Sequence, residues 1–414
     1  MSVEGPLLAA IIARLTDPKF NLAAYGVAFS FALIVEAPVI MMLSASTALV
    51  KDWQSFIQLK KFTYILNGTL TLFLLVVLLT PLFTFITETL IGLPANVSHL
   101  THIAMFILLP WPGAIGYRRF YQGILIRNNL TRRVAYGTII RLLSVVTTAF
   151  TLYFFFRVPG VIVGSTALSA GVIMEALASR LMVHSVLKRI KGIENLDNHD
   201  EPLTYSAISK FYYPLALTPM IALGVQPVIT FFMGQSRFSI ESFAVFPVVN
   251  SLVFIFRALG LSYQEVAISL MGKRAEGYIA LRNFATLLGA AVVILLSLIA
   301  FTPLSHLWYA KVSGLSEVLT AFAKLPTQVL ALIPGLTVLI SFQRAILVHS
   351  RKTPPITWAT VIEFAGIVAV LFLLIQNFDT VGVVAAAVAM VLGRLAANLY
   401  LIPFHTREVR KTLR

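Results

Sequence analysis

The sequence repeats itself at a fixed offset of 222 residues, without gaps, over most of its length. Phe120 to Leu125 falls on Phe342 to Leu347, since 120 + 222 = 342, and Thr131 falls on Thr353 in the same register. A period this long indicates two fused half-proteins rather than a solenoid of short repeats.

Each half is dominated by apolar residues. The mean hydropathy is +0.88, and only 12% of the residues are charged, whereas a soluble domain carries about 25%. Stretches long enough to cross a bilayer recur along the chain, and a lipid-exposed backbone must satisfy its own hydrogen bonds as helix. The eleven predicted spans lie near 22–50, 62–86, 98–126, 131–156, 160–187, 205–235, 239–271, 278–308, 317–349, 355–377 and 380–404. The sequence therefore predicts an all-α polytopic membrane protein with two six-helix lobes built from a parallel tandem repeat.

Basic residues are distributed unevenly between alternate loops. One set holds 19 Lys and Arg residues, among them Lys51, Arg132, Lys188 and the tail from Arg407 to Arg414, and the other set holds 6. Because basic loops remain in the cytoplasm, we expect the C-terminus to be cytoplasmic and the protein to lie in the inner membrane. The +15 net charge then mostly reflects the basic residues of the cytoplasmic loops, and a nucleic-acid partner is not expected.

The two halves differ in their first helix. Subtracting 222 from the span near 205–235 gives −17 to 13, so we expect the first helix of the N-terminal lobe to be truncated by roughly 18 residues, through a late start codon or a genuine shortening. The predicted domains are an N-terminal lobe at 1–190 with about five and a half helices, a polar cytoplasmic linker at 191–204 and a C-terminal lobe at 205–414 with six helices.

An even number of spans in each half relates the halves by an axis along the membrane normal. Parallel repeats of this kind build transporters whose substrate site lies between the halves near the bilayer midplane. The sequence contains no Walker-type phosphate loop, so ATP hydrolysis is not expected to drive the protein.

Two six-helix lobes without a nucleotide site resemble the multidrug/oligosaccharidyl-lipid/polysaccharide (MOP) flippase superfamily, which includes the multidrug and toxic compound extrusion (MATE) transporters. Ala23 to Ser30 and Tyr213 to Leu217 are most similar to the progressive ankylosis protein branch. The resemblance implies that the first two helices of each lobe line a cavity that opens to each side in turn. It also implies an acidic residue for cation coupling in the first helix, where Glu4 is the only acid. Small organic anions are the substrates that the branch suggests, and amphipathic cations or lipid-linked sugars are those of the wider superfamily.

Ionisable residues inside spans are costly and mark candidate functional sites. Glu36 and Arg257 are nearly equivalent in the repeat, since 36 + 222 = 258. Counted from Lys51 and Lys273, they lie about 22 to 24 Å deep at 1.5 Å per residue. We expect them to form a substrate or coupling-ion site or a gate between the lobes, and the alternative is a structural ion pair. Gln226, Gln264 and Glu265 on the same helices are further candidates for this site.

The remaining intramembrane charges favour structural roles. Arg141 and Glu363 occupy the same repeat position, while Glu175 and Arg394 lie on the following spans, so each lobe has one acid and one base on adjacent helices. Pairing within each lobe would lower the cost of burial. Arg118, Arg119 and Arg344 lie nearer the cytoplasmic ends, where they can extend toward water or form an anion-attracting vestibule.

Catalytic patterns are absent from the sequence, which has no cysteine, no His-Glu-x-x-His motif and no nucleophile elbow. An intramembrane enzyme and a channel are the alternatives from other classes. The favoured interpretation is a monomeric secondary-active exporter or flippase that moves a small organic solute or amphipath out of the cytoplasm by alternating access. A lipid-linked saccharide flippase is the second interpretation. No cofactor or metal is expected, H⁺ or Na⁺ is the expected coupling ion, and membrane lipid and a small-molecule substrate are the expected partners.

Overall fold

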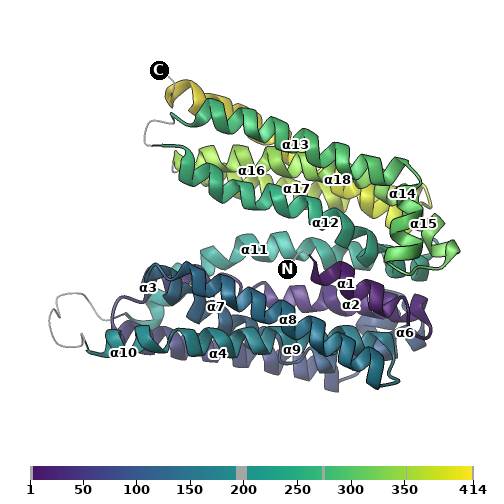
Figure 1. Ribbon diagram of the computed structural model, residues 1–414, viewed down its shortest axis with the longest axis horizontal. Helices are drawn as coiled ribbons and strands as arrows, with labels where there is room; N and C mark the ends of the chain where they lie inside the picture. Colours follow the sequence, from purple (N-terminus) through teal and green to yellow (C-terminus); the bar gives the residue numbers. More distant parts are fainter. Residues whose placement is uncertain (1–2, 193–202, 273–275, 351, 413–414) are drawn as a thin grey trace. The chain divides into compact units, whose positions relative to one another are not determined.

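The computed structural model describes residues 3–192, 203–272, 276–350 and 352–412. Within these ranges the chain is almost entirely helical (Figure 1). The helices of the first half are α1 (Glu4–Ile12), α2 (Pro18–Glu36), α3 (Met42–Leu49), α4 (Trp53–Leu79), α5 (Leu82–Thr84), η1 (Phe85–Leu90), α6 (Ala95–Ile107), α7 (Trp111–Arg127), α8 (Thr131–Phe155), α9 (Gly160–Met182) and α10 (His184–Gly192). Those of the second half are α11 (Tyr205–Gly234), α12 (Ser239–Leu270), α13 (Tyr278–Phe301), α14 (Leu304–His306), η2 (Leu307–Val312), α15 (Glu317–Leu330), α16 (Ile333–His349), α17 (Pro354–Phe372), η3 (Leu373–Asn377) and α18 (Gly382–Thr412).

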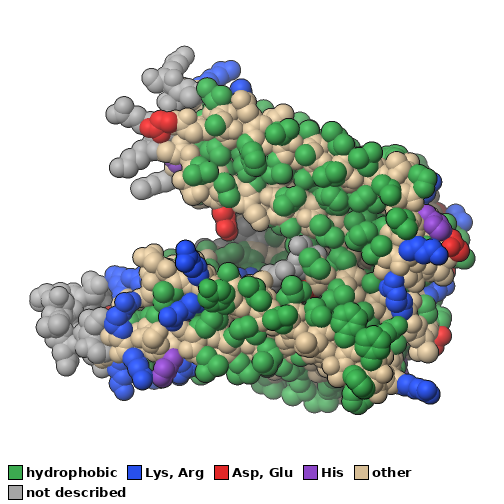
Figure 2. Space-filling model, in the orientation of Figure 1, with side chains coloured by type: hydrophobic (Ala, Val, Ile, Leu, Met, Phe, Trp, Pro, Cys, Tyr) green, Lys and Arg blue, Asp and Glu red, His purple; other side chains and the backbone are tan. Residues whose placement is uncertain are grey.

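Ten helical segments among the described residues are long and apolar enough to span a membrane, or eleven when the bent halves of α11 count as one span. Their lipid-accessible sides carry exposed apolar residues, such as Leu72 on α4, Phe154 on α8 and Leu287 on α13. Figure 2 shows apolar side chains over the flanks of the helices, with Lys and Arg gathered near helix ends. The all-α polytopic fold is thereby confirmed, and the chain is a multi-pass membrane protein.

Element bounds recur at the 222-residue offset. The π-helix η1 at 85–90 shifts onto η2 at 307–312, since 85 + 222 = 307 and 90 + 222 = 312. In the same way α7 shifts onto α16, since 111 + 222 = 333 and 127 + 222 = 349. Helix α1 shifts onto 226–234, which are the last nine residues of α11.

The first predicted span is broken in the structure, unlike its counterpart in the second half. The stretch near 22–50 consists of α2 and α3, separated by a turn at 37–41, whereas its counterpart α12 is continuous from Ser239 to Leu270. Pro38 explains the break, because proline removes a backbone donor and its ring collides with the preceding turn. Pro247 does not interrupt α12.

The predicted span near 160–187 is likewise two helices, because α9 ends at Met182 and α10 begins after Val183.

The chain forms two compact units. Among the described residues, unit 1 comprises those within 27–227, and unit 2 comprises 3–26 and those within 228–412. These units differ from the predicted lobes at both first helices. Residues 3–26 group with unit 2 because Gly26 packs against Pro247, where an added Cβ would lie 2.7 Å from Pro247 Cγ. The start of α11 groups with unit 1, where the Tyr212 hydroxyl donates to the Pro38 carbonyl. The predicted linker lies largely outside the described residues.

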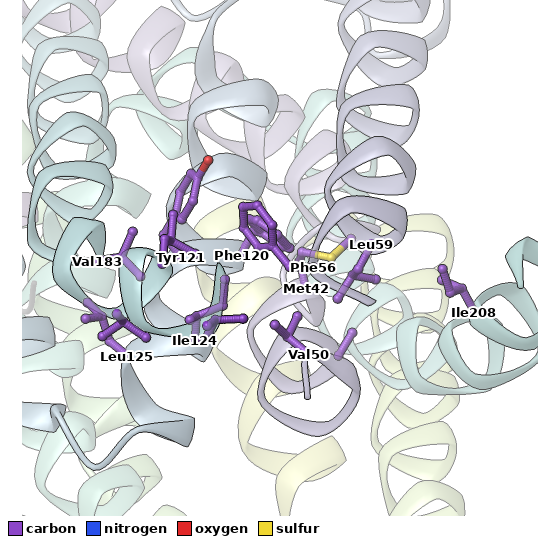
Figure 3. Close-up of a cluster of buried hydrophobic side chains, with 14 of the residues drawn as sticks. Met42, Val50, Phe56, Leu59, Phe120, Tyr121, Ile124, Leu125, Val183 and Ile208 are labelled. Atoms are coloured by element: carbon purple, nitrogen blue, oxygen red, sulfur yellow. The ribbon is translucent and has the colours of Figure 1, made fainter. Parts of the chain in front are cut away.

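Each unit has its own apolar core. In unit 1, residues of α3, α4, α7, α10 and the start of α11 converge around Met42, Phe56, Phe120 and Val183 (Figure 3). In unit 2, one cluster surrounds Tyr263 and Phe342, and a second surrounds Leu347 and Leu401. The charged side chains described next lie on the helices that enclose these cores.

Candidate functional site

In unit 1 the central buried charge is the Glu175 carboxylate on α9. Gln122 on α7 donates to it at 3.0 Å, the Arg118 guanidinium forms an ion pair with it, and Arg141 on α8 lies 3.8 Å away. The side chains of Arg118 and Glu175 are 2% and 1% exposed. Two arginines therefore share one carboxylate in this part of unit 1.

A glycine allows α8 and α9 to approach each other at this point. A Cβ added to Gly171 would lie 2.4 Å from Val145 and 3.4 Å from Arg141 Cγ, so only glycine leaves room. Its repeat equivalent is Gly393, since 171 + 222 = 393, where a Cβ would lie 2.8 Å from the Glu363 carbonyl oxygen. In both units a glycine at the helix contact therefore allows the charged residues of adjacent helices to come together.

Glu36 lies at the end of α2, close to a neutral donor. The Trp111 indole N–H donates to Glu36 Oε2 at 3.2 Å, and the carboxylate is buried. The Arg141 guanidinium lies over the Trp111 ring at 5.8 Å from its centroid. Arg119 interacts electrostatically with both Glu36 and Glu175. Glu36 is thus held by a hydrogen bond rather than by a described ion pair.

In unit 2 the corresponding acid is the half-buried Glu363 on α17. Arg394 on α18 donates to Glu363 through Nε at 2.8 Å and NH2 at 2.7 Å. A third nitrogen of Arg394 donates to the Thr337 hydroxyl at 3.2 Å. Here a single arginine neutralises the single acid.

Two further arginines of unit 2 lie within electrostatic range of this ion pair. Arg394 and Glu363 interact electrostatically with both Arg257 on α12 and Arg344 on α16. The Nε atoms of Arg257 and Arg344 are buried without a hydrogen bond, and Arg344 donates through NH2 only to the Thr360 hydroxyl, at 3.2 Å. No ion pair of either arginine occurs among the described residues of unit 2. The cluster therefore contains three arginines and one glutamate.

The structure brings together some of the predicted residues. The expected partners Arg141 and Glu175 lie near each other, as do Glu363 and Arg394. Arg118 was expected near water, but it is almost fully buried, because its side of α7 faces Glu175. Arg119 and Arg344 are half-buried.

The other candidates differ in burial. Gln226 on α11 and Gln264 on α12 are half-buried, Glu265 is exposed and Glu4 on α1 is buried. Glu36 belongs to unit 1 and Arg257 to unit 2, so their predicted pairing stays a prediction.

Sequence reasoning missed Trp111 and Gln122. Gln122 is the repeat equivalent of Arg344, since 122 + 222 = 344, and that correspondence could have revealed it. Among the residues described, no group of three or more His, Asp or Glu side chains could hold a metal ion.

Known proteins resemble this chain in structure rather than in sequence. No protein family and no curated protein match its sequence. A multidrug resistance MATE family transporter of the MOP superfamily, in an inward-facing conformation, matches with a TM-score of 0.76 and 15% identity over 100% of this chain and 95% of that protein. The lipid II flippase MurJ matches with a TM-score of 0.72 and 14% identity over 100% of this chain and 88% of its own. A MOP superfamily transporter from Pyrococcus furiosus, described as having a binding pocket of reverse polarity, matches with a TM-score of 0.61 and 15% identity over 99% of this chain and 87% of that protein.

These matches show the fold of the chain, which it shares with proteins described as membrane transporters and a flippase. More particularly, the fold is MATE-like.

Proposed function

We propose that the protein is a secondary-active transporter of the inner membrane that carries an organic anion out of the cytoplasm by alternating access. The MATE-like fold supports the transporter class. The observation that supports an anionic substrate is the excess of half-buried arginine in unit 2, where Arg257 and Arg344 have buried Nε atoms and no described carboxylate partner.

Charge balance favours an anion over a cation in unit 2. A buried charge without a counter-charge is unfavourable, and guanidinium groups bind carboxylate and phosphate oxygens through paired hydrogen bonds. A carboxylate or phosphate of a substrate would supply the acceptor that the free Nε atoms of Arg257 and Arg344 lack. A cationic substrate at the same place would be repelled by this charge excess.

Unit 1 supplies a candidate for ion coupling. Glu36 is buried and accepts a hydrogen bond from the neutral Trp111 indole. A carboxylate in this setting can bind H⁺ or Na⁺ as its surroundings alternate between the two sides of the membrane. Arg119 lies within electrostatic range of Glu36, so uptake of a cation there would be sensitive to the charge at residue 119.

A lipid-linked saccharide is the second candidate substrate. The similarity to a lipid II flippase over the whole chain supports it, and the phosphate groups of such lipids are also anionic. The two candidates share an anionic group and differ in whether a lipid tail accompanies it.

Transport in proteoliposomes tests the proposal. Small organic anions, amphipathic cations and a polyprenyl-phosphate saccharide are each supplied on the cytoplasmic side. We expect transport of an anionic compound, and its loss in Arg257→Gln and Arg344→Gln with little change in thermal stability. Arg282→Gln is the matched control, because Arg282 is an exposed arginine of the same unit. Transport of cations alone, or full anion transport by both cluster variants, would contradict the proposal.

A further inference from the structure

We propose that the cytoplasmic end of unit 1 carries a binding surface for anionic phospholipid headgroups, formed by α10 and the basic residues around it. This α10 surface consists of Lys60, Lys61, Arg132, Lys188, Arg189 and Lys191. It is separate from the buried clusters to which substrate transport is assigned, and it does not depend on that assignment.

Helix α10 is anchored by its apolar side. Val186, Leu187 and Ile190 are buried in the core that also contains Phe56, Leu59 and Leu125. Figure 3 shows Val183, at the junction of α9 and α10, within this core. Arg133 secures the junction by donating to the Met182 carbonyl and, at 3.0 Å, to the Ser185 hydroxyl. The helix is therefore held in place, and its polar side has a defined direction.

The polar side of α10 is basic and exposed. Lys188, Arg189 and Lys191 lie outside the core, and Arg189 donates only to the amide oxygen of Asn128. No carboxylate pairs with any of the six residues of the α10 surface in the part of the chain that the structure describes. Figure 2 shows Lys and Arg gathered at this end of unit 1. An apolar face and a basic face on one helix are typical of helices that lie in the membrane interface.

The position along the spans places this surface at the level of the lipid headgroups. Helix α10 directly follows the span Gly160–Met182, and the span before that one in the sequence begins at Thr131. Lys191 lies over the ring of Trp53 at 5.6 Å, and Lys60 over that of Tyr64 at 5.4 Å. Tryptophan and tyrosine are enriched at the membrane interface, and clustered Lys and Arg next to a span attract anionic lipids.

The corresponding end of unit 2 also carries basic residues, among them Arg410, but it is built differently. Helix α18 runs on without a break from Gly382 to Thr412, so the described part of unit 2 has no separate helix equivalent to α10. Its Lys352 is paired with Glu408 at 2.7 Å. The proposed lipid surface is accordingly a property of unit 1.

Thermal unfolding of the purified full chain in micelles tests this proposal. Phosphatidylglycerol is compared with phosphatidylcholine at equal concentration. We expect phosphatidylglycerol alone to raise the melting temperature, and Lys188→Gln/Arg189→Gln/Lys191→Gln to lose this rise without a change in the lipid-free melting temperature. The control Arg282→Gln/Arg407→Gln/Arg410→Gln removes the same charge from exposed positions of unit 2 and should keep the rise.

The outcomes separate a lipid surface from general charge attraction. An equal rise with both lipids, or an equal loss in both triple variants, would overturn the proposal. A rise in melting temperature that develops only after neutralisation of Glu194, Asp197, Asp200 and Glu201, the acidic residues after α10 in the sequence, would also overturn it. The basic surface would then bind these acidic residues of the same chain rather than lipid. Should the triple variant unfold, Lys191→Gln alone must reduce the rise while Lys191→Arg retains it.

Discussion

The buried charges of the two units show how a duplicated scaffold can diverge. In unit 1 the acid Glu175 is surrounded by Arg118, Gln122 and Arg141. In unit 2 the acid Glu363 has one ion-pair partner, Arg394, while Arg257 and Arg344 have none among the residues described. The helices are equivalent, yet the charge balance is not.

The difference arises from substitutions at matching positions. Arg141 corresponds to Glu363, so the acid and the base have exchanged helices between the units. Gln122 is a neutral donor to Glu175. Its repeat equivalent Arg344 carries a positive charge. Meanwhile the glycine that allows the helices to approach is present in both units, as Gly171 and Gly393. The backbone geometry was kept while the electrostatics changed, which fits the proposal that the Glu175 cluster is structural and that the arginines of unit 2 bind an anion.

The largest expected effect is in the labelling of matched positions, and it tests whether the units insert the same way up. The chain has no cysteine, so single cysteines can be introduced directly. Asn96 and Val318 are exposed and equivalent, since 96 + 222 = 318, and so are Ser185 and Arg407, since 185 + 222 = 407. We expect an impermeant thiol reagent to label the first pair in intact cells and not the second. Opposite labelling within either pair would show that the repeats are inverted, and the comparison of equivalent positions would then fail.

The next effect is on the stability of unit 1. Replacing Glu175 by Gln leaves Arg118 and Arg141 buried without their carboxylate, which should cost about 3 to 5 kcal/mol of unfolding free energy. Titration of the detergent-solubilised protein with denaturant measures this loss of unfolding free energy. Glu265→Gln, at an exposed position, is the control and should be close to wild type. A Glu175→Gln protein as stable as that control would show that the cluster of unit 1 is not structural.

Rescue by a second substitution should be a smaller effect and should differ between the units. Glu363→Gln should also destabilise, and adding Arg394→Gln should restore much of the loss, because Arg394 is the only arginine paired with Glu363 among the residues that the structure describes. Adding Arg141→Gln to Glu175→Gln should restore little, because Arg118 remains buried. The same unfolding titration measures both double variants, and equal rescue in the two units would remove the proposed contrast.

Much of this organisation could be predicted from the sequence, because the repeat and the apolar spans are long patterns. Facing pairs such as Glu363 and Arg394 followed from charges on consecutive spans that must be buried together. The depth of Arg118 did not follow, because Arg118 and Arg119 are neighbours in sequence but point about 100° apart on a helix. Which of the two meets Glu175 depends on the packing of α7 against α9. The sequence also did not distinguish Pro38, where the helix breaks, from Pro247, which the equivalent helix accommodates without a break.

The smallest expected effect concerns an ion pair within unit 2 that joins two repeat-equivalent residues. Lys19 Nζ lies 2.6 Å from Glu241 Oε1, and 19 + 222 = 241, so the pair links the first turns of the equivalent helices α2 and α12. Unlike the Arg118–Glu175 pair, its side chains are 37% and 23% exposed, and solvent screening limits such a pair to about 1 kcal/mol or less. We expect Lys19→Gln and Glu241→Gln each to lower stability by no more than that, with a larger loss at low salt than at high salt. Because the two helices are equivalent, exchanging the charges in Lys19→Glu/Glu241→Lys should restore the wild-type midpoint in the same titration. A loss as large as that of Glu175→Gln, or failure of the exchanged variant to recover, would show that partial exposure does not distinguish this pair from the buried clusters.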